Sequence, residues 1–223
     1  NKKILEYLNY FNMKKILIFT AGSAGRDIYQ LISTINKLNE EWEVIGYVDN
    51  DPKKIGKTID NVPVFSSKNK PKNNKIYGVC GLMNIKLRKK VFDNEIKNHY
   101  QLTNLFHPQT IKPKNLKIGN GNIIFNCNIN SNVKIKNFSV ISQYSNLGDH
   151  SIIGNYAHLL AHISIGSHTE IGDNTFIASG VHINRGVKIG TNCMLGIGTI
   201  IMPNIKSNSI VMDYPRQVIK KNK

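Results

Sequence analysis

The second half of the chain repeats with a period of six residues. Every sixth residue from position 129 to position 201 is isoleucine or leucine, without exception. A period of six matches neither the 3.6-residue repeat of an α-helix nor the simple alternation of a strand. It is the signature of a parallel β-helix, in which each hexad supplies one short strand and one turn, and successive coils stack. We therefore expect a β-helix over residues 107–212.

Two further positions of each hexad are restricted. Four residues after the lead residue stands a small or β-branched residue, such as Val133, Ser139 or Ala157, which we expect to pack beside the lead side chain. Glycine often follows the lead residue directly, where we expect it to permit the turn. Ile118 and Gly119 begin the pattern out of phase. This offset predicts a dropped or bulged residue within 125–128.

Composition narrows the class of protein. The 223 residues suffice for two small domains, and the three cysteines show no pairing pattern, as expected in a reducing, cytoplasmic compartment. No apolar run reaches the length of a membrane span, so we expect none. The net charge is +16, but the lysines are scattered and are not interleaved with aromatic residues. A nucleic-acid surface would need clustered basic residues and aromatic residues between them, so we expect no nucleic-acid partner.

Residues 13–106 alternate runs that favour strands with runs that favour helices. We expect strands at 15–19, 43–48 and 75–79, and helices at 27–38 and 85–99. This order is typical of a Rossmann-like α/β domain with a parallel sheet. The flanking segments belong to neither domain: 1–12 is an extension of unknown role, and 213–223 is a basic C-terminal tail.

Two glycines, Gly22 and Gly25, follow the first expected strand. Glycines at such a turn let backbone N–H groups approach a phosphate at a helix N-terminus. Asp49 and Asp51 end the next strand, where they are placed to accept hydrogen bonds from a ribose or a base. Thr20 replaces the first glycine of the full dinucleotide motif, which argues against a nicotinamide-dependent enzyme. A tight turn without any ligand is the alternative interpretation.

Three short motifs accompany these features: VIGYVDNDP at 44–52, VPV at 62–64 and LFHP at 105–108. Together with the hexads they resemble the sugar acyltransferases of the sialic acid O-acetyltransferase and sugar-nucleotide N-acetyltransferase family, within the hexapeptide-repeat superfamily. The resemblance covers nearly the whole chain from about residue 14. It implies a left-handed β-helix, a homotrimer with sites between subunits, and acetyl-CoA as the co-substrate without a metal.

The resemblance also implies a reaction and its ligands. The reaction is transfer of an acetyl group to the amino or hydroxyl group of a sugar, a nucleotide-linked amino sugar in surface glycan biosynthesis. By position, Gly22, Ser23 and Gly25 line the phosphates of the acceptor, and Asp49 and Asn50 line its base. The residues implied for acetyl-CoA are His158, Gly180, Gly198, Arg216 and Lys220, the last two in a segment that resembles the exit loop of the superfamily.

Acyl transfer from a thioester needs a general base, and histidine is suited by its pKa. The family places a His–Asp or His–Glu dyad two and three residues after a lead residue. Here Asp149 and His150 occupy those positions in swapped order. We expect His150 to be the base, oriented by Asp149. A second register makes His168 the alternative, and the two histidines, eighteen residues apart, should stack on one edge of the β-helix.

Other interpretations of these side chains stay open. His158 or His162 could supply the base, although His162 is expected on a different face. A dyad in swapped order could also be inactive, which would leave a nucleotide-sugar-binding or scaffold protein. Zinc is not expected, because the hexad spacing spreads the histidines around the prism. His158 and His182 are expected in turns, and Cys193 in the core.

Overall fold

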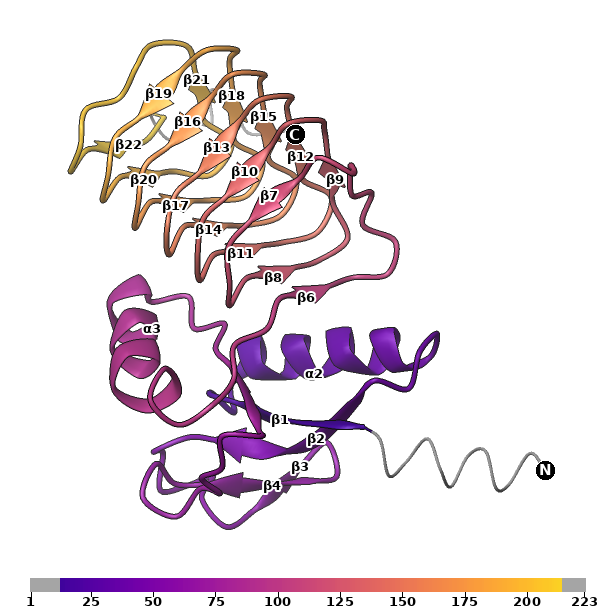
Figure 1. Cartoon of the computed structure of the whole chain (residues 1–223). Helices are drawn as coiled ribbons and strands as arrows, with labels where there is room; N and C mark the ends of the chain where they lie inside the picture. Colours follow the sequence, from indigo (N-terminus) through magenta and orange to yellow (C-terminus); the bar gives the residue numbers. More distant parts are fainter. Residues whose placement is uncertain (1–12, 214–223) are drawn as a thin grey trace, which may run out of the picture.

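The hexads coil into a three-sided prism in this computed structural model, which describes residues 13–213 (Figure 1). Each hexad contributes a two-residue strand, and strands one coil apart pair in parallel. Asn146, for example, pairs with Ser164, eighteen residues further on. The predicted parallel β-helix is therefore confirmed.

Three sheets form the sides of the prism. The first sheet contains β7 (Lys117–Ile118), β10 (Lys134–Ile135), β13 (Ile152–Ile153), β16 (Glu170–Ile171) and β19 (Lys188–Ile189). The second sheet contains β6 (Leu105–Phe106), β8 (Ile123–Ile124), β11 (Val140–Ile141), β14 (His158–Leu159), β17 (Phe176–Ile177), β20 (Met194–Leu195) and β22 (Ile210–Val211). The third sheet contains β9 (Asn128–Ile129), β12 (Asn146–Leu147), β15 (Ser164–Ile165), β18 (His182–Ile183) and β21 (Ile200–Ile201).

The second residue of nearly every strand points into the prism. Ile141, Leu147 and Leu159 are completely buried, and so are small residues four positions after a lead residue, such as Ala157. These side chains form one continuous aliphatic column. Each fully buried aliphatic side chain contributes about 1.5–3 kcal/mol relative to an exposed one, so stacking of coils stabilises the β-helix.

Glycine is required after the lead residues for a different reason from the predicted turn. A Cβ atom on Gly148 would lie 2.6 Å from backbone atoms of Ile165, Gly166 and Ser167 in the next coil. The close approach of coils therefore requires these glycines, whereas the left-handed turn position comes two residues later. The predicted phase change is confirmed, because Ile123 pairs with Val140 seventeen residues on, whereas Asn128 pairs with Asn146 eighteen residues on.

The N-terminal part is an α/β domain with a five-stranded sheet in the order β3-β4-β2-β1-β5. Helix α2 buries one face, which includes Ile28 and Leu31, and α3 continues into the wider turns of η1. Helix α2 begins four residues before the predicted start, because the extended backbone of Gly22 serves as its N-cap. The elements are β1 (Lys14–Ile18), α2 (Ser23–Asn36), β2 (Trp42–Val48), β3 (Thr58–Ile59), β4 (Val62–Phe65), β5 (Tyr77–Val79), α3 (Ile85–Val91) and η1 (Phe92–Ile96).

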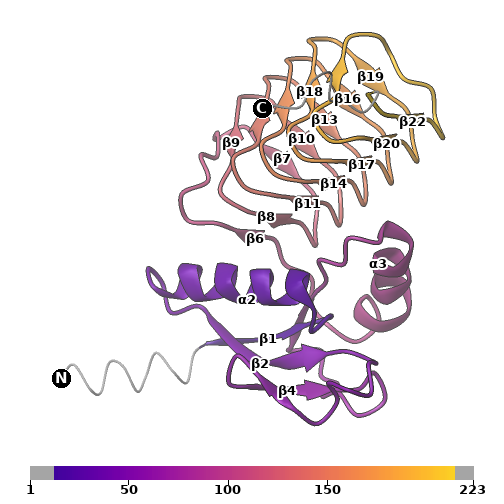
Figure 2. The ribbon, with the colours of Figure 1, turned by 180° about the vertical axis from the view of Figure 1, so that it is seen from behind.

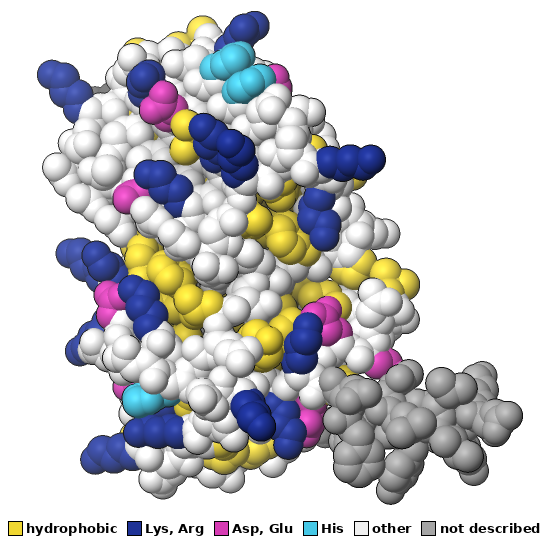
Figure 3. Space-filling model, in the orientation of Figure 1, with side chains coloured by type: hydrophobic (Ala, Val, Ile, Leu, Met, Phe, Trp, Pro, Cys, Tyr) yellow, Lys and Arg dark blue, Asp and Glu magenta, His cyan; other side chains and the backbone are white. Residues whose placement is uncertain are grey.

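The second sheet of the β-helix faces the N-terminal domain (Figures 1 and 2). Leu105, Ile123 and Val140 on this sheet join one apolar cluster with Ile28 and Leu31 of α2. Figure 3 shows hydrophobic side chains where the two parts meet. The edge between the first and third sheets lies opposite the second sheet in the triangle. It is therefore the edge farthest from the N-terminal domain.

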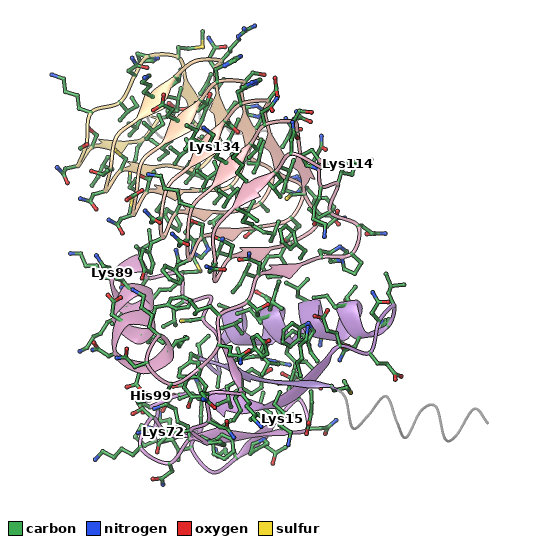
Figure 4. The ribbon with its side chains drawn as sticks, in the orientation of Figure 1. Lys15, Lys72, Lys89, His99, Lys114 and Lys134 are labelled. Carbon is green, nitrogen blue, oxygen red and sulfur yellow. The ribbon has the colours of Figure 1, made fainter. Side chains whose placement is uncertain are left out.

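Positive charge is distributed over both parts of the molecule. Lys and Arg side chains are spread across the face seen in Figure 3. The lysines labelled in Figure 4 lie far apart in the sequence, in β1, α3, β10 and the segments between elements, and all are exposed (Lys15, Lys72, Lys89, Lys114 and Lys134). Within residues 13–213, no helix is long and apolar enough to cross a membrane.

Candidate functional site

The predicted dyad lies in the turn between β12 and β13, on the edge between the third and first sheets. Asp149 Oδ2 and His150 Nδ1 are 2.7 Å apart, so the swapped order still forms a hydrogen-bonded pair. His150 has a left-handed backbone with φ of 58°, like the equivalent residue of other coils. Asn132 in the preceding coil donates its Nδ2–H to Asp149 Oδ1 at 3.3 Å. The His150 side chain is 49 % exposed, so a substrate can reach it.

The pair has the protonation pattern of an oriented base. A carboxylate only accepts hydrogen bonds, so in the neutral imidazole of His150 Nδ1 carries the hydrogen and Nε2 keeps a lone pair. The hydrogen bond from His150 is the main cause that lowers the pKa of the Asp149 carboxyl, and the bond from Asn132 adds to it. Asp149 is therefore ionised at neutral pH, which is the state that orients an imidazole.

His168, the alternative base, occupies the equivalent turn one coil later. Its ring stacks on the ring of His150 with centroids 4.9 Å apart and an interplanar angle of 13°. The predicted stacking on one edge is therefore confirmed. The backbone N–H of His168 donates to Asp149 O at 2.8 Å. Among the described residues, however, its ring has no carboxylate partner, so Asp149 orients only His150.

The same three residues offer ligand atoms within 4.8 Å of one another. Two nearly parallel, stacked rings direct their nitrogen lone pairs side by side. A zinc ion needs its ligands to converge on one point about 2.0–2.1 Å from each ring nitrogen. In addition, Asp149 already occupies Nδ1 of His150. The geometry fits an oriented base better than a metal centre.

The predicted acceptor residues Asp49 and Asn50 follow β2 and line a cavity of about 420 Å³ in the N-terminal domain. Apolar side chains form much of its wall, and Lys90 of α3 adds a cation. A mostly apolar cleft with a few polar groups is typical of a small-molecule site. The remaining lining residues are Phe19, Thr20, Val48, Ser67, Leu82, Leu87, Val91, Asn94 and Glu95.

The Asp49 carboxylate is already engaged within the protein. It accepts the backbone N–H of Ala21 at 2.9 Å and of Asp51 at 3.0 Å, and Lys54 Nζ lies 3.2 Å away. Burial raises the pKa of Asp49, but these three hydrogen bonds outweigh burial and lower it overall. Asp49 therefore ties the glycine loop to the end of β2. Asn50 uses its Oδ1 for the N–H of Ser67, which leaves its Nδ2–H₂ group for a ligand.

The glycine loop opens α2 beside this cavity. Gly22 is the N-cap, and the first turn contains neither a side-chain cap nor an acidic residue. The free N–H groups and the helix dipole make this end positive, which suits a phosphate. Ser23 is the first helical residue. Gly25 has a packing role, because a Cβ atom there would lie 2.0 Å from Thr20 O.

The residues predicted for acetyl-CoA do not form one cluster. Gly180 and Gly198 follow each other on the edge between the second and third sheets, with φ of 72° and 69°. His162 and Tyr144 cover the same edge in the preceding coils, and their rings stack with centroids 5.1 Å apart. His158 instead lies in β14 of the second sheet, which faces the N-terminal domain. Arg216 and Lys220 lie outside the described residues.

The prediction of His158 and His182 in turns is wrong. Both are the first residue of a strand, in β14 and β18, because the lead residue falls second in each strand. His158 is also only 3 % exposed. The sequence reasoning missed its partner, Arg88 of α3, which is completely buried against it. Cys193 is buried in the column, as predicted.

Comparisons with known proteins bear on this arrangement. Residues 168–203 match the family described as bacterial transferase hexapeptide (six repeats). No curated protein matches the chain at the sequence level. The acetyltransferase domain of PglB from Neisseria gonorrhoeae FA1090, in complex with acetyl coenzyme A, is similar with a TM-score of 0.80 at 16 % identity, over 89 % of this chain and 95 % of that one. The predicted resemblance is confirmed in the fold.

Two further solved structures have the same fold. PerB from Caulobacter crescentus, in complex with CoA and GDP-perosamine, has a TM-score of 0.76 at 17 % identity and covers 88 % of this chain and 92 % of its own. WeeI from Acinetobacter baumannii AYE has a TM-score of 0.76 at 19 % identity and covers 89 % and 96 %. The likeness therefore extends over both domains.

Proposed function

We propose that the protein is an acetyl-CoA-dependent acetyltransferase that acts on the amino or hydroxyl group of a sugar, with a nucleotide-linked amino sugar as acceptor. The observation that carries the proposal is the hydrogen-bonded Asp149–His150 pair with an accessible Nε2. It stands on a fold shared with a domain bound to acetyl coenzyme A and with a protein bound to CoA and GDP-perosamine.

The dyad would act as a general base in direct transfer. His150 Nε2 takes the proton of the acceptor amine or hydroxyl as that group attacks the thioester carbonyl. A new C–N or C–O bond forms, the C–S bond breaks, and the proton passes from His150 to the CoA thiolate. A backbone N–H of a neighbouring turn stabilises the oxyanion. A positioned base of this kind contributes about 10²- to 10⁴-fold to the rate.

The N-terminal domain would hold the acceptor. We propose that this domain is Rossmann-like, and the order β4-β2-β1-β5 of its parallel strands supports that assignment. The nucleoside fits the cavity beside Asn50, and its phosphates meet Ser23 at the uncapped start of α2. Gly25 and Asp49 shape this loop from behind, because Gly25 packs against Thr20 O and the Asp49 carboxylate accepts the backbone N–H of Ala21.

The separation of the acceptor cavity from the Asp149–His150 pair supports a site between subunits of a homotrimer. The acceptor cavity lies in the domain that covers the second sheet, whereas Asp149 and His150 lie on the opposite edge. An acceptor held by one chain therefore needs the dyad of another. The bare edge at Gly180 and Gly198 flanks the same third sheet and suits the long arm of acetyl-CoA. We further propose that the β-helix is left-handed, that the protein acts in the cytoplasm and that its product is used in surface glycans.

Release of CoA thiol from acetyl-CoA tests the proposed reaction. The acceptor panel contains UDP-, dTDP- and GDP-linked amino sugars and free sialic acid. We expect turnover with one of the nucleotide-linked sugars. Binding of a nucleotide sugar without CoA release would instead support the alternative function, a nucleotide-sugar-binding or scaffold protein with an inactive dyad.

Mixing two inactive variants tests the placement between chains. Leu87→Trp fills the acceptor cavity from an exposed position, and His150→Ala removes the base. If one chain supplies the cavity and another the dyad, refolding the two variants together restores part of the activity. The proposed placement fails if the mixture stays as inactive as each variant alone although mixed oligomers form.

A further inference from the structure

Two histidines follow each other on the edge that carries the Asp149–His150 pair, where the neighbouring coils have no ring. The left-handed position of successive coils on this edge is taken by Asn132, His150, His168 and Gly186, with φ between 58° and 74°. Packing does not require the ring of His168, because its side chain is exposed and Gly186 fills the same position one coil later. A task in the site is the better explanation for the second ring.

The ring of His168 can accept a hydrogen bond from a substrate. Its backbone N–H donates to Asp149 O at 2.8 Å, and its ring stacks on His150. Among the described residues, however, the ring nitrogens of His168 have no hydrogen-bond partner. A neutral imidazole keeps one lone pair that can accept an N–H or an O–H. His168 can therefore contact a substrate group that reaches the neighbouring Nε2 of His150.

The spacing of the two rings suits an amine better than a metal ion. One ring nitrogen of His168 lies within 4.8 Å of a ring nitrogen of His150, and the ring centroids are 4.9 Å apart. Two nitrogens that share a tetrahedral zinc ion lie about 3.3 Å apart. A tetrahedral amine that donates both of its hydrogens at about 2.9 Å spans about 4.7 Å between its two acceptors. The stacked pair matches the second distance.

We propose that His168 accepts the second N–H of the acceptor amine, so that His150 and His168 hold the attacking nitrogen between them. The inference rests on the proposed function and deepens it. A hydroxyl has one hydrogen and can donate to only one of the two rings, whereas an amine can donate to both. The stacked pair therefore favours transfer to an amine over transfer to a hydroxyl.

The two hydrogens of the amine have different fates. The amine reacts uncharged, after its ammonium proton has passed to water. Its nitrogen attacks the thioester carbonyl, the C–N bond forms and the C–S bond breaks. The hydrogen that faces His150 passes through that base to the CoA thiolate, whereas the hydrogen that faces His168 remains as the amide N–H of the product. His168 therefore takes up no proton, but it fixes the direction in which the nitrogen lone pair points.

Two acceptors and two variants test this role. The acceptors are the nucleotide-linked amino sugar that turns over and its analogue with a hydroxyl in place of the amine. His168→Phe keeps a ring in the stack but removes the acceptor, and Phe138 shows that the left-handed turn accepts phenylalanine. We expect His168→Phe to lower kcat/KM about 3- to 10-fold for the amine, as for one lost neutral hydrogen bond, and less than about twofold for the hydroxyl. His168→Gln, whose amide oxygen can accept the N–H, should recover most of the loss.

Comparison of the two acceptors separates a substrate contact from mere support of the His150 ring. An equal loss for both acceptors in His168→Phe would show that His168 only supports that ring. An unchanged kcat/KM for the amine would show that His168 does not contact it. Either result would overturn the inference. If the hydroxyl analogue is not acetylated, its inhibition constant replaces kcat/KM.

A second readout needs no turnover. In ¹⁵N NMR spectra of the whole protein at pH 8 without acetyl-CoA, a bound UDP-, dTDP- or GDP-linked amino sugar should shift the accepting nitrogens of both His150 and His168. The hydroxyl analogue should shift only one. Both shifts in a protein without turnover would support the inference although the proposed reaction fails. A shift confined to His150 would overturn the inference and leave the proposed function intact, and binding of none of these sugars would overturn both.

Discussion

The spacing of the coils makes a quantitative prediction about Gly172. A Cβ atom there would lie 2.5 Å from the carbonyl carbon and oxygen of Gly190. Carbon atoms in contact prefer about 3.5 Å, so Gly172→Ala must open the coils by about 1 Å. The bond from Gly172 N–H to Ile189 O is 2.8 Å long, and that shift takes it beyond the usual range. We expect a loss of about 2–3 kcal/mol, from overpacking and weakened ladder bonds.

Thermal unfolding followed by circular dichroism measures this loss, and the expected fall in Tm is about 4–12 °C for a chain of this size. Gly186→Ala is the matched control, because a Cβ atom there meets nothing within 4 Å and only the left-handed backbone, with φ of 74°, is strained. That strain costs about 1 kcal/mol. A Gly172→Ala protein that is as stable as Gly186→Ala, or more stable, would refute the reasoning.

Three further predictions follow from single contacts. Ile165→Ala should cost about 2–5 kcal/mol in denaturant unfolding, because this side chain is 1 % exposed, whereas Ile197→Ala, at 77 % exposed, should change stability by less than about 0.5 kcal/mol. The pKa of Asp49 lies below its ordinary 3.8, so its ionised carboxylate stabilises the fold above that pH, and this stabilisation is lost as the pH falls through the lowered pKa. The difference in stability between wild type and Asp49→Asn should therefore shrink below about pH 4, and a difference that widened there would contradict the account. Gly180→Tyr should raise KM for acetyl-CoA more than tenfold and leave KM for the acceptor within twofold, because the ring would cover the edge proposed for acetyl-CoA. The turn itself accepts tyrosine, since Tyr144 adopts the same left-handed conformation on this edge; an equal rise in both KM values would show that the edge does not select acetyl-CoA.

The β-helix was predictable because its repeat is a direct consequence of its geometry. The inward position of the lead residues, the loss of one residue near 125–128 and the stacking of His150 on His168 all depend only on counting along a coil. The alternation of strands and helices in the N-terminal domain was visible for the same reason, since apolar runs report burial locally.

The features that the sequence did not predict depend on contacts between distant segments. The glycine at position 148 looked like a turn residue, although its cause is the backbone of the next coil. Asp49 looked like a ligand for a ribose, but it binds the N–H of Ala21, which no local pattern reveals. Arg88 is spaced like the buried Phe92 and Ile96, four and eight residues later, so its inward position could have been noticed. Its partner His158 lies seventy residues away, and only the folded chain joins them.

The central claim is that Asp149 makes His150, and not the stacked His168, the base for acetyl transfer. The most direct test is kcat/KM for CoA release with a productive acceptor, compared among wild type, His150→Ala and His168→Ala, each with an unchanged far-ultraviolet spectrum. We predict a fall of about 10²- to 10⁴-fold for His150→Ala and of less than tenfold for His168→Ala. Full activity in His150→Ala, or the larger loss in His168→Ala, would contradict the account.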